Sequence, residues 1–205
     1  MGTKARRGSF VAICALTAIA ILIAGAAQAT VGEKKKPKVV PLATAAAWVA
    51  VGPALGLDPD QPAPEQFTDS TAPRVQQIAA LITGLSFKGV GSQTFSRTAA
   101  DPSDSSRLIG NYIVKVVVFK TAADAKKFRA ADTKEVTDRG ALKKVGTYRD
   151  GDVLDDGQGH INVMYTIGNV VVDVRTGVSE TGAGTGVTDA KNVAAAILAN
   201  SKKSS

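Results

Sequence analysis

The sequence predicts an α+β domain in which helices pack on a mostly antiparallel sheet. Residues 112–120 form an unbroken run of branched and aromatic side chains that is typical of a strand, and residues 160–176 contain two more such runs. Most connections between these strands are short and polar, whereas helical patterns stand near both ends of the strand-rich region. These three observations favour a single domain, preceded by an N-terminal export signal.

The first 29 residues have the composition of a secretory signal peptide. A basic segment, 4–7, precedes an apolar run from Phe10 to Ala27, and the small-x-small pattern that ends at Ala29 suits a signal peptidase. Cleavage there would leave Thr30 as the first residue of a secreted protein. The alternative is a retained single-pass anchor with residues 30–205 facing outward, since the run is at the short end of membrane-spanning length. Only in that case would the protein contact a membrane, through this segment.

Composition excludes several kinds of chemistry. The one cysteine, Cys14, lies inside the apolar run, so residues 30–205 contain no thiol nucleophile, no disulfide and no cysteine ligand for zinc. The formal charge of +7 falls to +4 without the signal, which carries three basic residues and no acid. Such a mild excess does not require a nucleic-acid partner. About 176 residues remain, enough for one hydrophobic core.

The remaining chain divides into a linker and a domain. Residues 30–41 are polar, basic and proline-containing, which is typical of a tether, and their lysines could contact anionic polymers or lipid head groups. Residues 42–205 form the predicted domain. It begins with an apolar, alanine-rich stretch at 42–57 and continues with a proline-rich loop at 58–73.

The elements of the domain follow from periodicity and caps. A helix is expected from Ser70 or Thr71 to Leu85, and a second begins after Thr121 as its N-cap, with Ala125, Phe128 and Ala131 buried. A third covers 188–203, with Thr188 as its cap. Strands are expected at 89–99, at 112–120, weakly before the acidic turn at 150–159, and twice within 160–176. Gly168-Asn169 marks either a two-residue hairpin turn or a bulge.

A glycine-rich loop before the last helix raises the question of nucleotide binding. Its glycines are spaced as Gly182-x-Gly184-x-Gly186, which is not the G-x-G-x-x-G of a dinucleotide fold, and no strand follows the helix. A polar, flexible loop is therefore expected there, and no cofactor is predicted.

A cluster of four carboxylates is a weak candidate for a metal site. Asp150, Asp152, Asp155 and Asp156 lie in a glycine-rich segment, and clustered oxygen ligands suit calcium. The EF-hand spacing fails, however, because Leu154 occupies a ligand position. Aspartate and glycine also favour turns, so a plain acidic hairpin is the simpler interpretation.

His160 is the single histidine. It could act as a general base with Asp150, Asp152 or Asp155, which would make the protein an extracytoplasmic hydrolase. No nucleophile motif accompanies it, so a surface histidine beside a turn is the simpler interpretation.

The last hundred or so residues resemble a known family. The residues that carry the likeness are Thr-Ala-Ala-Asp-Ala-Lys-Lys-Phe at 121–128, Ile-Gly-Asn-Val-Val-Val-Asp-Val at 167–174, and the closing alanine-rich helix. This pattern is similar to small exported actinobacterial cell-surface domains, including the extracellular sensor domain of PknH-type receptor kinases. The resemblance implies an α+β sheet with helices around a cleft, and a ligand-sensing role without catalysis. This chain lacks the paired cysteines and the lipidation cysteine of those proteins, and any kinase.

Together these observations predict an exported, non-enzymatic domain that binds a small ligand or a cell-envelope component. The alternative is the hydrolase centred on His160.

Overall fold

Helices cover both faces of one antiparallel sheet in the computed structural model, which describes residues 38–98, 108–177 and 186–204. The strands are β1 (Asp58–Pro59), β2 (Glu65–Phe67), β3 (Phe87–Thr98), β4 (Leu108–Phe119), β5 (Lys143–Tyr148), β6 (Gly151–Asp155), β7 (Ile161–Ile167) and β8 (Val170–Gly177). The helices are α1 (Leu42–Trp48), α2 (Gly52–Leu55), α3 (Pro73–Gln76), α4 (Ala79–Ile82), α5 (Ala122–Asp138) and α6 (Gly186–Lys203). The predicted α+β class, with helices packed on a mostly antiparallel sheet in a single domain, is confirmed.

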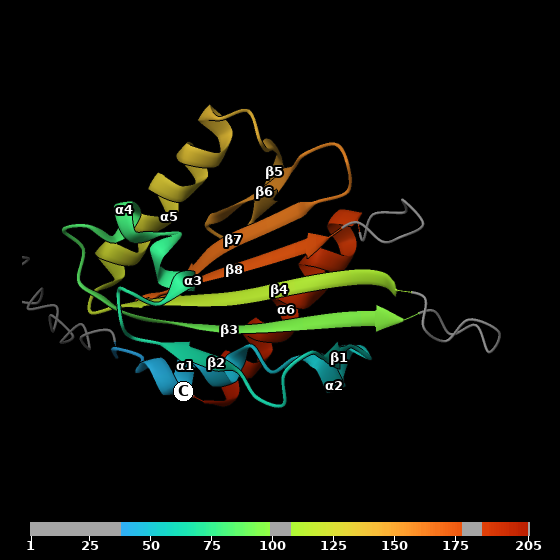
Figure 1. Ribbon diagram of the computed structural model, residues 1–205, viewed down its shortest axis with the longest axis horizontal. Helices are drawn as coiled ribbons and strands as arrows, with labels where there is room; N and C mark the ends of the chain where they lie inside the picture. The colour runs from blue at the N-terminus through green and yellow to red at the C-terminus, as the bar shows by residue number, and fades with distance from the viewer. Residues whose placement is uncertain (1–37, 99–107, 178–185, 205) are drawn as a thin grey trace, which may run out of the picture. The chain divides into compact units, whose positions relative to one another are not determined.

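The sheet has eight strands in the order β1-β3-β4-β8-β7-β6-β5, and β2 also pairs with β3. Each of these pairs is antiparallel. The long strands β3 and β4 run side by side across the sheet, and α6 passes behind it in this view (Figure 1). None of the helices in the described part of the chain is both long and apolar enough to cross a membrane.

Alternation along β4 and β8 supplies two separate cores. Val114, Val116, Val172 and Val174 point to one side, where they pack with α1 and α6. Residues one step along, such as Val117 and Val171, point to the other side and pack with α5. We call these sides the α6 face and the α5 face. Because helices cover both, the central strands are apolar at most positions.

Several local expectations are confirmed. Thr121 caps α5, since its side chain accepts a hydrogen bond from the backbone N–H of Asp124, and Ala125 and Phe128 are buried. Gly168 and Asn169 form a two-residue hairpin turn rather than a bulge, because Ile167 pairs directly with Val170 and Gly168 has φ +58°.

The third buried position of α5 was wrongly predicted. Asp132 is buried there, whereas Ala131 is only partly covered.

The expected helix from Ser70 or Thr71 to Leu85 was wrong as one element. It forms two short helices, α3 and α4, separated at Gln77 and Ile78. The break lets both Val75 and Ile82 reach the core of the α5 face. The last helix begins at Gly186, two residues before the expected cap Thr188.

The acidic segment after residue 149 was also more regular than expected. Residues 151–155 form β6 instead of a turn, because Val153 and Leu154 are completely buried, one on each side of the strand. At the start of the domain, Val40 exchanges two backbone hydrogen bonds with the side chain of Asn169. Residues from Val40 onward therefore belong to the packed domain.

Candidate ligand cavity

A cavity of about 410 Å³ opens on the α5 face, between the end of α5 and the sheet. Its apolar wall consists of Ile113, Val136, Leu142 and Ile161. Its polar lining consists of Asn111, His160, Asn162, Arg175, Thr176 and Gly177. This size and mixture fall within the range of small-molecule sites, roughly 300–1,000 Å³.

Strand register brings the polar residues together from distant parts of the sequence. Arg175 of β8 stands opposite Ile113 of β4 on one side and opposite Asn162 of β7 on the other. Asn111, two residues along β4, pairs with Gly177. One row of the sheet therefore contributes Ile113, Arg175 and Asn162, and the next contributes Asn111 beside a glycine with no side chain.

Two side-chain amide oxygens in the lining of this cavity are buried without a hydrogen-bond partner. The Oδ1 atoms of Asn111 and Asn162 have no hydrogen bond to any residue that the structure describes, and Asn162 is only 3% exposed. A buried polar atom without a partner is uncommon in folded proteins and costs about 1–3 kcal/mol. Both oxygens are covered in this structure, so a ligand or water that carries N–H or O–H groups would reach them only if the surrounding side chains move.

Arg175 is held by its neighbour on the same strand. Its Nε lies 2.9 and 3.2 Å from the two carboxylate oxygens of Asp173, and its second guanidinium nitrogen lies 2.8 Å from one of them. The charge of Asp173, with its hydrogen bonds, raises the pKa of Arg175. The cation at the cavity is thus fixed in position and largely neutralised.

Further ionisable groups on the α5 face include Lys115 on β4 and Asp132 on α5. Burial lowers the pKa of Lys115 and raises that of Asp132 to about 6; the negative charge of Asp173 adds to the second effect. Neither side chain forms an ion pair with a residue in the described ranges. The polar lining therefore continues from the cavity under α5.

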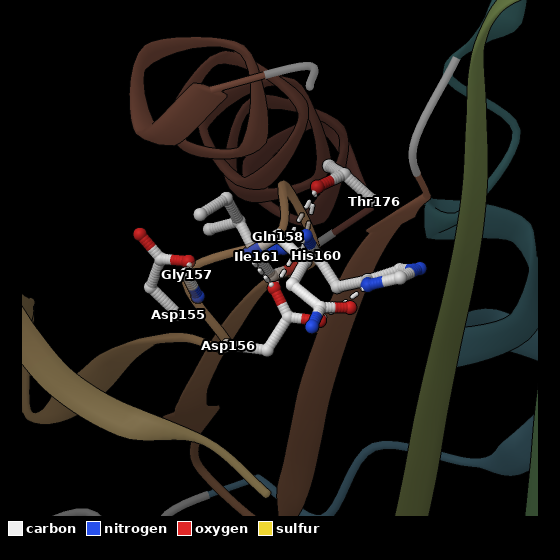
Figure 2. Close-up of polar contacts among 7 residues, drawn as sticks. All are labelled: Asp155, Asp156, Gly157, Gln158, His160, Ile161 and Thr176. Atoms are coloured by element: carbon white, nitrogen blue, oxygen red, sulfur yellow. Dashed lines mark hydrogen bonds and ion pairs between the residues drawn. The ribbon is translucent and has the colours of Figure 1, made fainter. Parts of the chain in front are cut away.

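His160 lies at the rim of the cavity and contacts Asp156. Its Nδ1 meets the Asp156 carboxylate, whose other oxygen accepts from the backbone N–H groups of Gln158 (2.7 Å) and His160 (3.0 Å). Figure 2 shows the imidazole ring beside this carboxylate in the turn between β6 and β7. The histidine side chain is 52% exposed. Its carboxylate partner, Asp156, is not one of the three that the hydrolase hypothesis named.

The other carboxylates of the acidic segment each have separate partners. Asp150 binds Thr166, accepting from its backbone N–H at 3.0 Å and from its hydroxyl group. Asp152 pairs with Arg129 at 3.2 Å and with Lys144. Asp155 accepts from the N–H of Gly157 at 2.7 Å.

The four carboxylates do not converge on one point. In the described part of the chain no three side chains among histidine, cysteine, aspartate and glutamate are grouped as a metal site needs. The predicted cleavage residues Ala29 and Thr30, and the glycines Gly182 and Gly184, lie outside the described residues.

Sequence reasoning missed the residues that define the cavity, Asn111, Asn162 and Arg175. They match no motif, because they meet only through pairing between strands. One signal was available, however. Asn162 and Arg175 interrupt strands in which most other positions are apolar, and a polar side chain within such a strand indicates an internal polar site.

No protein-family model and no curated protein sequence matches this chain. Among solved structures, it is similar to the crystal structure of the extracellular domain of PknH from Mycobacterium tuberculosis. The TM-score is 0.53 at 16% sequence identity, over 81% of this chain and 98% of that one. At this identity the likeness is one of fold, and it confirms at that level the resemblance inferred from 121–128 and 167–174.

Proposed function

We propose that this protein is a non-enzymatic, sensor-like domain that works outside the cytoplasm and binds a small ligand or a cell-envelope component in the α5-face cavity. One observation carries the proposal: a cavity of about 410 Å³ is lined by Asn111 and Asn162, whose buried side-chain oxygens have no partner among the described residues. The export signal supports the location. The fold of the PknH extracellular domain supports the sensor-like role.

The lining indicates the class of ligand. Four apolar side chains form one wall, so the ligand needs an apolar part that leaves water on binding. The two amide oxygens accept hydrogen bonds, so the ligand also needs N–H or O–H donors on its opposite side. Muropeptides and hydroxylated envelope lipids have both properties.

The proposal predicts opposite effects of Asn162→Leu on the free and the bound protein. Leucine has a similar shape and lies beside Leu154 in the register, so the free protein should become about 1 kcal/mol more stable. The same variant should lose the stabilisation that the ligand provides. Thermal unfolding with a panel of muropeptides and envelope lipids measures both effects.

Gln61→Leu is the matched control, since the Gln61 amide donates to the hydroxyl of Thr94 at 2.8 Å and accepts from its backbone N–H at 3.1 Å, away from both cavities. That variant should lose stability and keep the ligand response. A panel in which no compound stabilises the wild-type protein, or one in which Asn162→Leu responds normally, would overturn the proposal.

The contact between His160 and Asp156 favours one alternative, an extracytoplasmic hydrolase. A carboxylate on Nδ1 leaves Nε2 able to accept a proton from a water molecule at the cavity rim. The nearby hydroxyl of Thr176 is not a suitable nucleophile, because it already accepts from the N–H of Ile161 at 3.1 Å and can donate to its carbonyl at 3.4 Å.

Hydrolysis of ester and glycoside substrates by the wild type, His160→Gln and Asp156→Asn tests this alternative. An enzyme of this kind should lose at least about a hundredfold in kcat in both variants. Equal rates in the three proteins would exclude it and leave the binding proposal standing.

A further inference from the structure

A second cavity, of about 360 Å³, lies on the other side of the sheet, where the first described residues meet the end of the chain. Its apolar wall includes Val40, Pro41, Trp48 and Ile167, and Lys38 and Ser204 stand at its edge. It shares no lining residue with the α5-face cavity. We call it the Trp48 cavity.

The wall of the Trp48 cavity is fixed by hydrogen bonds from opposite ends of the domain. Asn169 holds Val40 through both its backbone N–H, at 2.8 Å, and its backbone oxygen, at 3.1 Å. The Asn200 amide donates to the backbone oxygen of Trp48 at 3.2 Å, which ties α6 to α1. The cavity is therefore formed before any ligand arrives.

The indole N–H of Trp48 is a hydrogen-bond donor without an acceptor in this mostly apolar wall. The residue is 2% exposed, and its indole Nε1 has no hydrogen-bond partner among the described residues. A buried indole N–H normally finds an acceptor.

Among the residues that the structure describes, the lining of the Trp48 cavity contains one lysine and no carboxylate. This lysine is Lys38, and Lys202 and Lys203 immediately precede the lining residue Ser204. All three lysines are exposed, and none forms an ion pair with a described residue. No aspartate or glutamate stands within three residues of the six lining residues named above. The basic stretch at 34–36 adjoins Lys38 in the sequence.

Next to Lys38 in the sequence, Val39 is 56% exposed, which is unusual for a large apolar side chain in this domain. An apolar cavity with Lys38 at its edge, and with Lys202 and Lys203 next to its lining residue Ser204 in the sequence, suits one kind of molecule. We propose that the Trp48 cavity binds an anionic amphiphile, with its alkyl chain against Val40, Trp48 and Ile167 and its carboxylate or phosphate group among Lys38, Lys202 and Lys203.

Trp48 is the only tryptophan in the sequence, so its fluorescence reports directly on this cavity. The protein that begins at Thr30 is titrated with a bromine-bearing dodecanoate below its micelle concentration. Bromine is chosen because it quenches tryptophan fluorescence only at contact. We expect saturable quenching that unlabelled dodecanoate reverses. The methyl ester should bind more weakly, and inorganic phosphate should not compete at equal concentration.

Charge variants test the role of these lysines. In Lys38→Gln/Lys202→Gln, the affinity for the bromododecanoate should fall by roughly tenfold or more, and the wild-type affinity should fall as salt rises. Lys126→Gln/Lys127→Gln, which removes the same charge from exposed positions on α5, is the control and should bind normally. Asn162→Leu should also bind normally, which separates this cavity from the proposed sensor site.

A parallel titration with phosphatidylglycerol vesicles carrying brominated chains tests whether the bound amphiphile is a soluble molecule or a membrane lipid. Quenching by the free acid indicates a soluble amphiphile, and quenching by vesicles alone indicates a membrane lipid. If neither the free acid nor the vesicles quench the fluorescence saturably, the proposal is overturned. An equal loss of affinity in the two double variants, or no loss in Lys38→Gln/Lys202→Gln, would also overturn it.

Discussion

Asp132 places a carboxyl group at a buried position of α5, where Ala125 and Phe128 occupy the other buried positions. It is 6% exposed. Burial raises its pKa to about 6, and the charges of Asp173 and Glu135 act in the same direction, while Arg175 and Lys115 oppose them. The folded protein therefore binds this proton more tightly than the unfolded chain does, in which the pKa is near 3.8.

The sign of the pH dependence follows from this difference. As the pH rises from about 4 to 6, the unfolded chain releases the Asp132 proton before the native state does, so the contribution of Asp132 to stability falls. Above pH 6 the loss is complete and amounts to about 3 kcal/mol. Asp132→Asn should accordingly raise the free energy of unfolding at pH 7.5 and have little effect at pH 4.

Urea unfolding of the wild type and Asp132→Asn between pH 4 and 8 measures this difference. Asp58→Asn, a change at an exposed aspartate of β1 that forms no ion pair with a described residue, serves as the reference for removing one negative charge. Parallel stability curves for wild type and Asp132→Asn would contradict the assignment.

Asn169 shows how one polar side chain can connect three segments. Its amide binds the backbone of Val40 and donates to the carbonyl oxygen of Phe119 at 2.6 Å. The residue is 3% exposed although it belongs to a tight turn. The Gly168-Asn169 pair therefore sets the position of the first described residues as well as the turn between β7 and β8.

At the scale of elements, the β5–β6 hairpin depends on close contact with β7. A Cβ atom added to Gly151 would lie 1.7 Å from the carbonyl oxygen of Met164. Gly146, in the partner strand β5, has space for a side chain. The atom nearest to an added Cβ would be the Cβ of Val153, 3.9 Å away. These two glycines thus have different roles despite their similar surroundings in the sequence.

Gly151→Ala should destabilise the protein by about 1–3 kcal/mol, because backbone atoms of β6 and β7 must separate. Gly146→Ala should be neutral or slightly stabilising, since alanine restricts the unfolded chain. Thermal unfolding of the two variants provides the comparison. Equal stability would show that β6 can move away from β7 without cost.

The short helices α3 and α4 show how tertiary packing overrides a helical pattern. Apolar residues from Val75 to Leu85 have helical spacing, which is why one helix was predicted. A straight helix of that length would have to match one continuous groove on the sheet. Two short turns instead allow Val75 and Ile82 to be buried separately against the α5-face core.

At the scale of the whole molecule, stability rests on burial on two faces of one sheet. Residues 30–205 contain no cysteine, so no disulfide can assist. The two clusters of buried hydrophobic residues, one on each face of the sheet, stabilise the fold instead.

Whether this domain is free or anchored depends on the predicted export signal at residues 1–29. If the bond between Ala29 and Thr30 is cut, N-terminal sequencing of protein from the culture medium should begin at Thr30. Ala29→Leu should block cleavage and move the protein to the membrane fraction. Wild-type protein that stays in the membrane and keeps the apolar run from Phe10 to Ala27 would establish the anchored alternative.

The sequence by itself determined the α+β class, most of the strands and the start of α5 at Thr121. These features depend on local chemistry: branched residues favour extended backbone, and a threonine hydroxyl satisfies a free N–H at a helix end. The sequence also made His160 and the acidic segment candidates for a site, which stays a prediction, and it did not predict the contact between His160 and Asp156.

Only the tertiary structure decided where the polar groups meet. Asn111, Asn162 and Arg175 belong to three strands and become neighbours through register, which depends on the pairing of whole strands. Lys38 and Ser204 come from opposite ends of the domain and line one cavity, whose wall is held by hydrogen bonds of Asn169 and Asn200. Local sequence patterns contain no information about such contacts, because the free energy that selects them comes from burying the sheet on both faces at once.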